Sequence, residues 1–372
     1  MNPVKWTGII ESNTNTSDTN WYNYQAQSQA TDGKTSSWAN VKMTDGSYYV
    51  WIPRYCYKII YFDTEPHAND YRINGLTTEN NAWIQGYSTV YGILDKNKKV
   101  IDGTSPNINQ VDRVKTEGYT DYVPHPAFLG VGYEDLGGGF GTSSKGTPGF
   151  WMAKFEASNS ANKPLSVPNV QSWKGNPVGT MYTNAYNYNR TYDSHLIKNS
   201  EWGAVAYLTH SRYGRNGSEV RINNNTEGYT GWGATTHNAA QVSYNGMSTA
   251  NLWTGQYGQL ASTTGNVAGV YDMSGGTWEY VAVFNRLYSG TYYTNYGASF
   301  ASYLGNSTKY ATAYDNTNAL RYAIKFADFA DGRDTSRTGD AMREVWVKDD
   351  AGWFVDYSYF VSLQYPFLNR GR

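Results

Sequence analysis

Apolar and aromatic residues gather into a few short blocks along the chain, and long polar stretches separate these blocks. Residues 47–60 read SYYVWIPRYCYKII, a block rich in the aromatic and β-branched residues that favour strands. Pro53 within it indicates an edge strand or a bulge, because proline cannot donate to a ladder. A second strand is predicted over residues 149–156, where apolar and polar positions partly alternate.

Two helices are predicted between these strands and the C-terminal half of the chain. The first runs over residues 180–188 with Thr180 as its N-cap, and the second runs over 200–213 and stops at Gly214. Their inward-facing stripes are Met181, Ala185 and Tyr188 in the first helix, and Trp202, Val205, Ala206 and Leu208 or Thr209 in the second. Short strands, two helices and long loops together predict an α+β fold.

The organisation of the chain is predicted as a polar N-terminal extension over residues 1–46 and one main domain over 47–372. Clusters of Thr, Asn, Ser and Gln fill the extension, interrupted by Trp6, Trp21 and Trp38. The main domain is loop-rich over 61–147 and again after about residue 214. No internal repeat stands out.

The amino-acid composition limits the classes of function that we expect for this chain. Charged residues make up 16% of the chain, against roughly 25% in an average soluble protein. The net charge is −1 and no long basic run occurs, so we expect no nucleic-acid binding. No apolar run approaches the roughly 18 residues that span a bilayer, and MNPVKWTGII lacks the order of a signal peptide. We therefore expect a soluble chain without membrane insertion.

The sequence has few candidates for catalytic or metal-binding side chains. Cys56 is the only cysteine, which excludes a disulfide and a two-thiol metal site, and we expect it to be a half-buried strand residue. The histidines fit no chelating spacing, so we expect surface or helix-adjacent positions for all five: His67, His125, His195, His210 and His237. No nucleophile elbow or phosphate-binding loop occurs.

Three segments together resemble the formylglycine-generating-enzyme (sulfatase-modifying-factor) family. They are residues 150–156 (FWMAKFE), 196–206 (LIKNSEWGAVA) and, the longest and most specific, 265–280 (GNVAGVYDMSGGTWEY). The resemblance implies a variant of the C-type lectin fold over residues 47–372. It also places three tryptophans on helix and strand positions of the core: Trp151, Trp202 and Trp278.

The family's enzymes hold copper with a cysteine pair, which the late part of this chain lacks, so neither copper nor oxidase chemistry is expected. The same fold serves, without catalysis, in variable proteins of diversity-generating retroelements and in phage receptor-binding proteins. The low charge and the abundance of Tyr, Asn and Ser resemble that branch. The resemblance therefore implies binding of a protein or glycan ligand on a cell surface, by a virion or bacterial-surface protein that could form oligomers. The alternatives are a divergent oxidoreductase or hydrolase, and a structural virion component.

The resemblance further implies a calcium site in the third segment, which we call the signature loop, at Asp272, Gly275, Thr277 and Glu279. Ca²⁺ prefers several oxygen ligands around a tight turn, and the two adjacent glycines of this loop permit such a turn. The alternative interpretation is that Asp272 caps the turn and Glu279 pairs with an arginine.

Residues 352–371 resemble the stretch that leads into the family's R-G-G element. We expect an exposed aromatic contact surface there, since Tyr and Trp give contact area at low entropy cost. Its candidate ligand-binding residues are Trp353, Phe354, Tyr357, Tyr359, Tyr365 and Asn369. The alternative is that these rings fill the core. The family continues to a further strand, so the chain is expected to be C-terminally incomplete, and Arg343 with Glu344 is interpreted as a structural pair.

Overall fold

The computed structural model describes fourteen stretches of the chain, and the fold below refers to them alone. They are residues 1–24, 37–61, 86–91, 93, 123–128, 147–211, 213–215, 223, 228–233, 249–285, 295–296, 310–314, 339–341 and 367–371.

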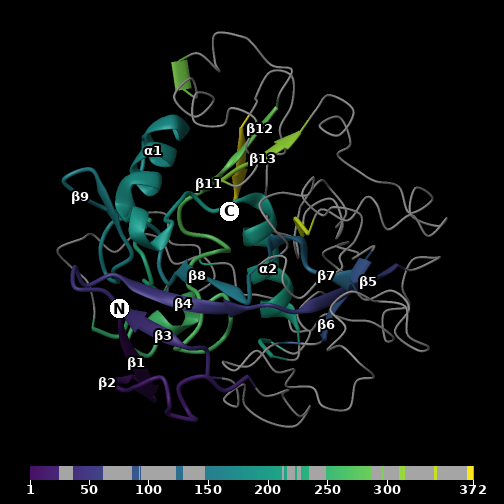
Figure 1. Ribbon diagram of the computed structural model, residues 1–372. Coiled ribbons are helices and arrows are strands. Elements are labelled where there is room, and N and C mark those ends of the chain that lie inside the picture. Colours follow the sequence, from purple (N-terminus) through teal and green to yellow (C-terminus); the bar gives the residue numbers. More distant parts are fainter. Residues whose placement is uncertain are drawn as a thin grey trace, which may run out of the picture.

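An antiparallel five-stranded sheet forms one side of the structure (Figure 1). Its strands, in spatial order, are β2 (Ile10–Asn13), β1 (Asn2–Thr7), β3 (Asn40–Lys42), β4 (Tyr48–Pro53) and β8 (Gly149–Ala153). The strand predicted over 149–156 is present as β8, which ends at Ala153 rather than at Glu156. Pro53 is the last residue of β4, which lies between β3 and β8, so the edge strand predicted from it is wrong.

The block over 47–60 forms two strands rather than one. The chain breaks the ladder after Pro53 and enters β5 (Cys56–Tyr61), which belongs to a separate sheet of order β6-β5-β7. That sheet is completed by β6 (Gly86–Tyr91) and β7 (Val123–Pro124), both within the stretch predicted to be loop-rich.

The described residues also form three further strand pairs and three short 3-10 helices. The antiparallel pairs are β9 (Ser158–Ser160) with β10 (Lys163–Leu165), and β11 (Glu279–Val281) with β14 (Leu368–Arg370). The pair β12 (Val283–Asn285) and β13 (Thr312–Tyr314) is parallel. The short 3-10 helices are η2 (Pro126–Phe128), η4 (Arg190–Tyr192) and η6 (Gly258–Ala261).

Both predicted helices are present, with shifted ends. Helix α1 (Val178–Tyr188) begins directly after Pro177, whose fixed φ suits a helix start, rather than at Thr180. It buries Val178 and Tyr182 instead of the predicted stripe. With mixed strands and two helices, the α+β class is confirmed. No helix among the described residues is long and apolar enough to cross a membrane.

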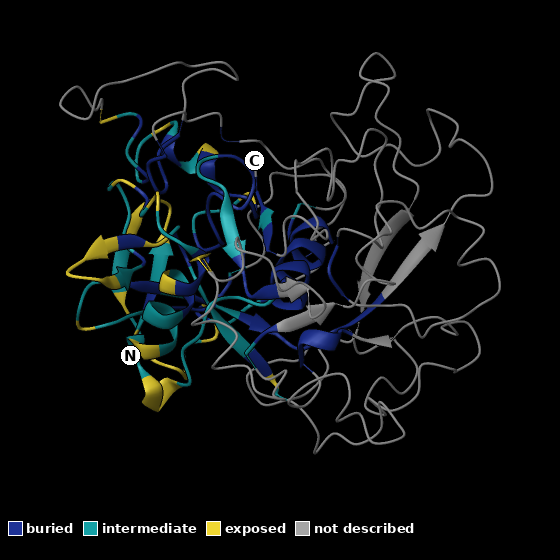
Figure 2. Ribbon diagram, turned by 90° about the horizontal axis from the view of Figure 1, so that it is seen from above, coloured by how far each residue is buried: buried dark blue, intermediate teal, exposed yellow. Residues whose placement is uncertain are grey.

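Helix α2 (Asn199–His210) is buried on every side, and its ribbon is dark blue throughout in Figure 2. It ends at His210, three residues before the predicted end. The predicted stripe is therefore too narrow: all twelve residues are buried. Strand β6 and η2 lie against the helix.

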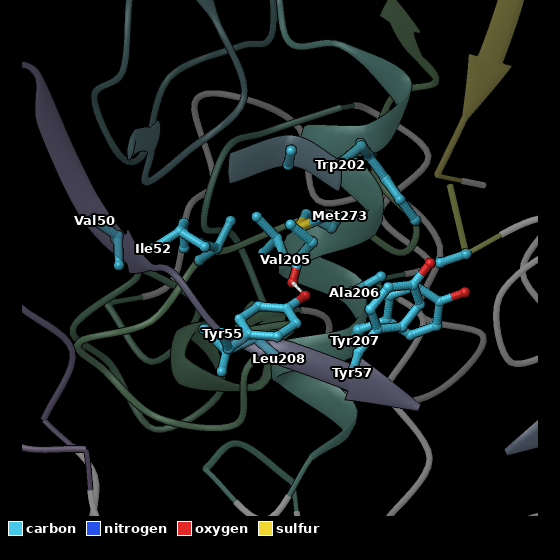
Figure 3. Packing of buried hydrophobic residues seen from close by; sticks show 14 of the residues in the cluster. Val50, Ile52, Tyr55, Tyr57, Trp202, Val205, Ala206, Tyr207, Leu208 and Met273 are labelled. Atoms are coloured by element: carbon cyan, nitrogen blue, oxygen red, sulfur yellow. Dashed lines mark hydrogen bonds between the residues drawn. The ribbon is translucent and has the colours of Figure 1, made fainter. Parts of the chain in front are cut away.

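The main hydrophobic core forms between α2 and the strands β4 and β5 (Figure 3). Val50 and Ile52 point from β4 towards the helix, which contributes Trp202 and Leu208. The Tyr55 hydroxyl donates to the carbonyl of Ala204 at 2.6 Å, so the phenol is satisfied within the core.

Cys56 is buried at the start of β5, where burial raises the pKa of its thiol to about 12. The predicted strand position is confirmed, although the side chain is fully rather than half buried. Because the reactive thiolate is strongly disfavoured at neutral pH, Cys56 acts as a small apolar core residue.

The N-terminal strands share their sheet with β4 and β8, and they also contact the signature loop. Trp6 of β1 packs edge-on against Trp253, with ring centroids 4.7 Å apart. Its indole N–H donates to Asn40 Oδ1 at 3.3 Å, and Asn40 Nδ2 donates to the carbonyl of Ala268 at 2.6 Å. Asn40 thus connects the N-terminal strands to the loop region that follows residue 265.

Candidate functional site

The signature loop turns sharply, with three positive-φ residues within five positions. Asp272, Gly275 and Gly276 have φ values of 61°, 85° and 79°. A side chain at position 275 would collide with the backbone of Asn223, whose N–H donates to the carbonyl of Ser274 at 2.8 Å. Glycine is therefore required where the loop passes this second segment.

The Asp272 carboxylate points inward and fastens two neighbouring segments. Its Oδ1 accepts a hydrogen bond from Asn223 Nδ2 at 2.7 Å, and its Oδ2 accepts one from the Gly231 N–H. Burial raises the pKa of Asp272 to about 7, although both hydrogen bonds act in the opposite direction. In this arrangement the carboxylate stabilises the turn.

Glu156 is a second carboxylate that contacts the same loop; it is partly buried, and the sequence analysis assigned it no role. Its Oε1 accepts from the Thr277 N–H at 2.7 Å, and its Oε2 accepts from the Ser172 hydroxyl. Burial, followed by the charge of Asp272, raises the pKa of Glu156 well above its usual value. The available signal was its place as the last residue of the first family-like segment, FWMAKFE.

The Glu279 carboxylate lies at the far end of the loop, at the first residue of β11. A side chain at Gly371 would collide with Glu279 Oε2 and come within 2.9 Å of the Met273 carbonyl oxygen. Both oxygens therefore lie against Gly371. The Asp272 carboxylate instead contacts Asn223 and Gly231.

The predicted calcium ligands are thus brought into one loop, but their side chains contact different neighbours. Thr277 Oγ1 is buried with no hydrogen-bond partner in the described part of the chain, and it lies against Gly228. No group of three or more His, Cys, Asp or Glu side chains suited to a metal occurs among the described residues.

The candidate ligand-binding residues fall mostly outside the described ranges, namely Trp353, Phe354, Tyr357, Tyr359 and Tyr365. Asn369 is described: it lies in β14 opposite Tyr280 and is half-buried. Its Oδ1 atom is buried and accepts no hydrogen bond within the described structure.

Arg370, which follows Asn369 in β14, connects the described segment 367–371 to the described segment 339–341. Its Nη1 donates to Asn199 Oδ1 at 2.7 Å and to the carbonyl of Asp340, and its Nη2 donates to the carbonyl of Ala341 at 3.3 Å. The guanidinium also stacks on Trp202, 3.7 Å from the ring centroid. We call Asn199, residues 339–341 and residues 367–371 the anchor.

Backbone contact with α2 fixes the other part of the anchor. A side chain at Gly203 would collide with the carbonyl of Gly339, so the 339–341 segment lies directly on the helix backbone. A side chain at Gly339 would come within 2.6 Å of the His125 ring. Residues 339–341 are therefore held on both sides.

Two histidines are buried, so the surface alternative expected for them is wrong, but both lie at helices, as the other alternative expected: His125 directly precedes η2 and His210 ends α2. His125 lies fully buried among Tyr55, Tyr57 and Tyr207, and burial lowers its pKa to about 3. His210, at the end of α2, is adjacent to no surface because the whole helix is enclosed. His67 and His237 lie outside the described residues, as do Arg343 and Glu344.

The predicted core tryptophans divide into two groups. Trp202 is 1% exposed and belongs to the main core, as predicted. Trp151 and Trp278 are only half-buried. Trp151 lies directly across from Trp51 in the β4–β8 ladder, with ring centroids 5.1 Å apart.

Among known proteins, no protein-family model matches this chain, and no curated protein matches it in sequence. By its fold and site, the chain is an α+β protein with mostly antiparallel strand pairs around a buried helix, and with a loop held by the carboxylates of Asp272 and Glu156.

Proposed function

We propose that this chain is a non-enzymatic ligand-binding protein with a formylglycine-generating-enzyme-like variant of the C-type lectin fold. Its contact surface is carried by residues 342–366 together with Asn369. The observation that carries the proposal is the anchor, in which Arg370 binds both Asp340 and Ala341. Five of the six candidate ligand-binding residues lie between the two fastened ends.

An anchored base suits a binding segment for an energetic reason. Binding residues are often placed on loops that a rigid scaffold positions. Ordering such a loop on binding opposes affinity, and fixing its two ends lowers that cost. Aromatic side chains add contact area with few rotatable bonds, which lowers the cost again.

The titratable groups of the described structure support binding rather than catalysis. The Glu156 carboxylate accepts from the Thr277 N–H of the signature loop, and the Asp272 carboxylate accepts from the Gly231 N–H. Burial leaves the Cys56 thiol with a pKa of about 12 and the His125 imidazole with a pKa of about 3. Asp272, Cys56 and His125 are buried, and Glu156 is partly buried.

Calcium forms part of the proposal, at the end of the signature loop. The Glu279 carboxylate would hold the ion together with backbone carbonyls, for which Gly275 and Thr277 are the candidates. Asp272 is already engaged by two donors and would act only by holding the turn. A bound ion would compensate the negative charge of Glu279 and would make the junction between the signature loop and β14 more rigid.

Chelation tests the calcium site. A ligand at one hundred times its Kd stabilises the folded state by about 2.7 kcal/mol. The melting temperature of the wild-type chain should therefore rise with calcium and fall with EGTA, and Glu279→Gln should abolish the response. Asp272→Asn is the matched variant and should keep it. An unchanged wild-type melting temperature would refute the site, and loss of the response in Asp272→Asn alone would return Asp272 to the ligand set.

The expected partner is a protein or glycan on a cell surface, and the setting is a virion or a bacterial surface. Family resemblance supports this part of the proposal, including diversification by a retroelement. A screen on glycan arrays and whole bacterial cells is the direct test. The double variant Trp353→Ala/Tyr357→Ala should lose binding while its unfolding free energy stays within about 0.5 kcal/mol of wild type, as for surface substitutions.

A matched control uses an aromatic residue at another surface. Tyr192 in η4 is 50% exposed, so Tyr192→Ala removes a comparable ring far along the sequence from the proposed segment. It should leave ligand binding unchanged. Equal loss in both variants, or full binding by the double variant, would show that the segment is not the contact surface.

A further inference from the structure

His195 lies between two acceptors in the connection from α1 to α2. Its Nδ1 is 2.9 Å from the carbonyl oxygen of Asp193, and its Nε2 is 3.1 and 3.2 Å from the two carboxylate oxygens of Glu201. A carbonyl and an ionised carboxylate only accept hydrogen bonds. Neutral imidazole has one N–H, so only the protonated ring satisfies both contacts.

Charged and polar groups face His195 from each element around it. On α2, Glu201 is buried, and the Lys198 ammonium lies 3.7 Å from Glu201 Oε1. On the connection, Arg190 Nη2 lies 3.2 Å from Asp193 Oδ1, and next to β13 the Tyr310 ring lies 5.5 Å from the imidazole.

These groups act on the imidazole in opposite directions. Burial and the Lys198 charge disfavour protonation, but the Glu201 carboxylate outweighs them, and the pKa of His195 is raised. The pKa of Glu201 is lowered to about 2, because the attraction of His195 and Lys198 exceeds the opposing effect of burial. Electrostatics and geometry therefore favour the same protonated form.

The first turn of α2, which contacts His195 through Glu201, also contributes Asn199 to the anchor. Glu201 Oε2 accepts from the Lys198 N–H at 2.8 Å and so caps the start of α2. Within that turn, Asn199 Oδ1 accepts from Arg370 at 2.7 Å. The contact of His195 with Glu201 and the contact of Arg370 with Asn199 thus depend on one turn of backbone.

We propose that His195 acts as a proton-dependent switch, which we call the clasp. The protonated imidazole binds Asp193 and Glu201 and thereby stabilises the first turn of α2 and the anchor. The deprotonated imidazole releases both contacts. The consequence for ligand affinity, which should be higher at lower pH, rests on the proposed function. The effect on the anchor does not.

The direction of the pH dependence follows from the raised pKa. The stabilising contribution of His195 is fully present below its unfolded-state pKa, about 6.5, and is lost as the pH rises through the folded-state value. Each unit between the two values changes the folding equilibrium about tenfold. The pH window of the clasp therefore begins near 6.5 and extends upward.

Proton NMR titration and hydrogen exchange of the full chain test the clasp directly. His195 should titrate above 6.5, identified by the loss of its signal in His195→Gln. Protection of the amides of residues 199–201 and 368–370, corrected for intrinsic exchange, should decrease between pH 6 and pH 9 in the wild type. In His195→Gln it should be lower at pH 6 and independent of pH.

Glu201→Gln provides the second variant, since its amide oxygen can still accept from the Lys198 N–H but carries no charge. It should bring the His195 titration back towards 6.5. His67→Gln is the histidine control and should behave as wild type. A wild-type His195 that titrates at or below 6.5 would overturn the clasp, as would an unchanged pH dependence of protection in both variants. A failed ligand screen would refute only the binding function.

Discussion

Replacing Arg370 with methionine should destabilise the protein strongly. Methionine preserves much of the side-chain length and packing, but it removes the charge and every donor. Asn199 Oδ1 and the carbonyls of Asp340 and Ala341 would each lose a donor inside the protein. An unsatisfied buried acceptor costs about 1–3 kcal/mol. Three acceptors lose a donor, so we expect a total loss of at least about 3 kcal/mol.

Urea denaturation followed by tryptophan fluorescence measures this loss. The companion Arg370→Lys keeps the charge but presents a single ammonium, which cannot reach three acceptors as a guanidinium fork does, so it should recover only part of the stability. In a double-mutant cycle with Asn199→Ala, the coupling energy should be about 0.5–3 kcal/mol. A loss below about 1 kcal/mol for Arg370→Met, or additive effects in the cycle, would show that Arg370 does not hold the anchor.

Three further predictions concern buried groups. Lys154→Met should lower the unfolding free energy by about 1–3 kcal/mol in urea, because the ammonium donates to two backbone carbonyls at 2.6 and 2.9 Å; an unchanged value would refute this role. Gly276→Ala should cost more than Gly175→Ala, since both have positive φ but only the former would bring a Cβ within 2.9 Å of Glu156; equal losses would contradict the close contact. Iodoacetamide at pH 8 should label Cys56 no faster than the chain unfolds, because of the thiol's burial and raised pKa.

Local sequence patterns predicted where helices and strands lie in the chain. They predicted less well where each element ends and how far it is buried. The aromatic and β-branched block and the partly alternating segment identified β4, β5 and β8, because such patterns report directly on strand geometry. The start of α1 was missed because Pro177, rather than a side-chain cap, precedes its first turn. The burial of α2 could not be predicted from a 3.6-residue period, since that period assumes one exposed face. Here a backbone contact between Gly203 and Gly339 covers a second face.

The candidate site shows the same division between local and distant information. The two glycines after Asp272 indicated a tight turn, and the structure has one there. The partner of that turn, Glu156, lies 121 positions before Thr277, and no local spacing connects the two residues. Likewise, nothing near Arg370 in the sequence indicates that it binds Asn199, 171 positions earlier. Side chains that join distant segments are visible only once the chain is folded.

The distribution of these long-range contacts bears on how a binding surface could vary without loss of the fold. Gly275 and Gly339 have no room for a side chain, and Arg370 binds three groups at once, so these positions tolerate little change. All three lie outside residues 342–366, and two of them adjoin its ends. The anchor holds residues 339–341 against Gly203 of α2, and it holds Arg370 against Asn199 and Trp202 of the same helix. This separation is what a protein requires if its contact residues change while its scaffold is retained.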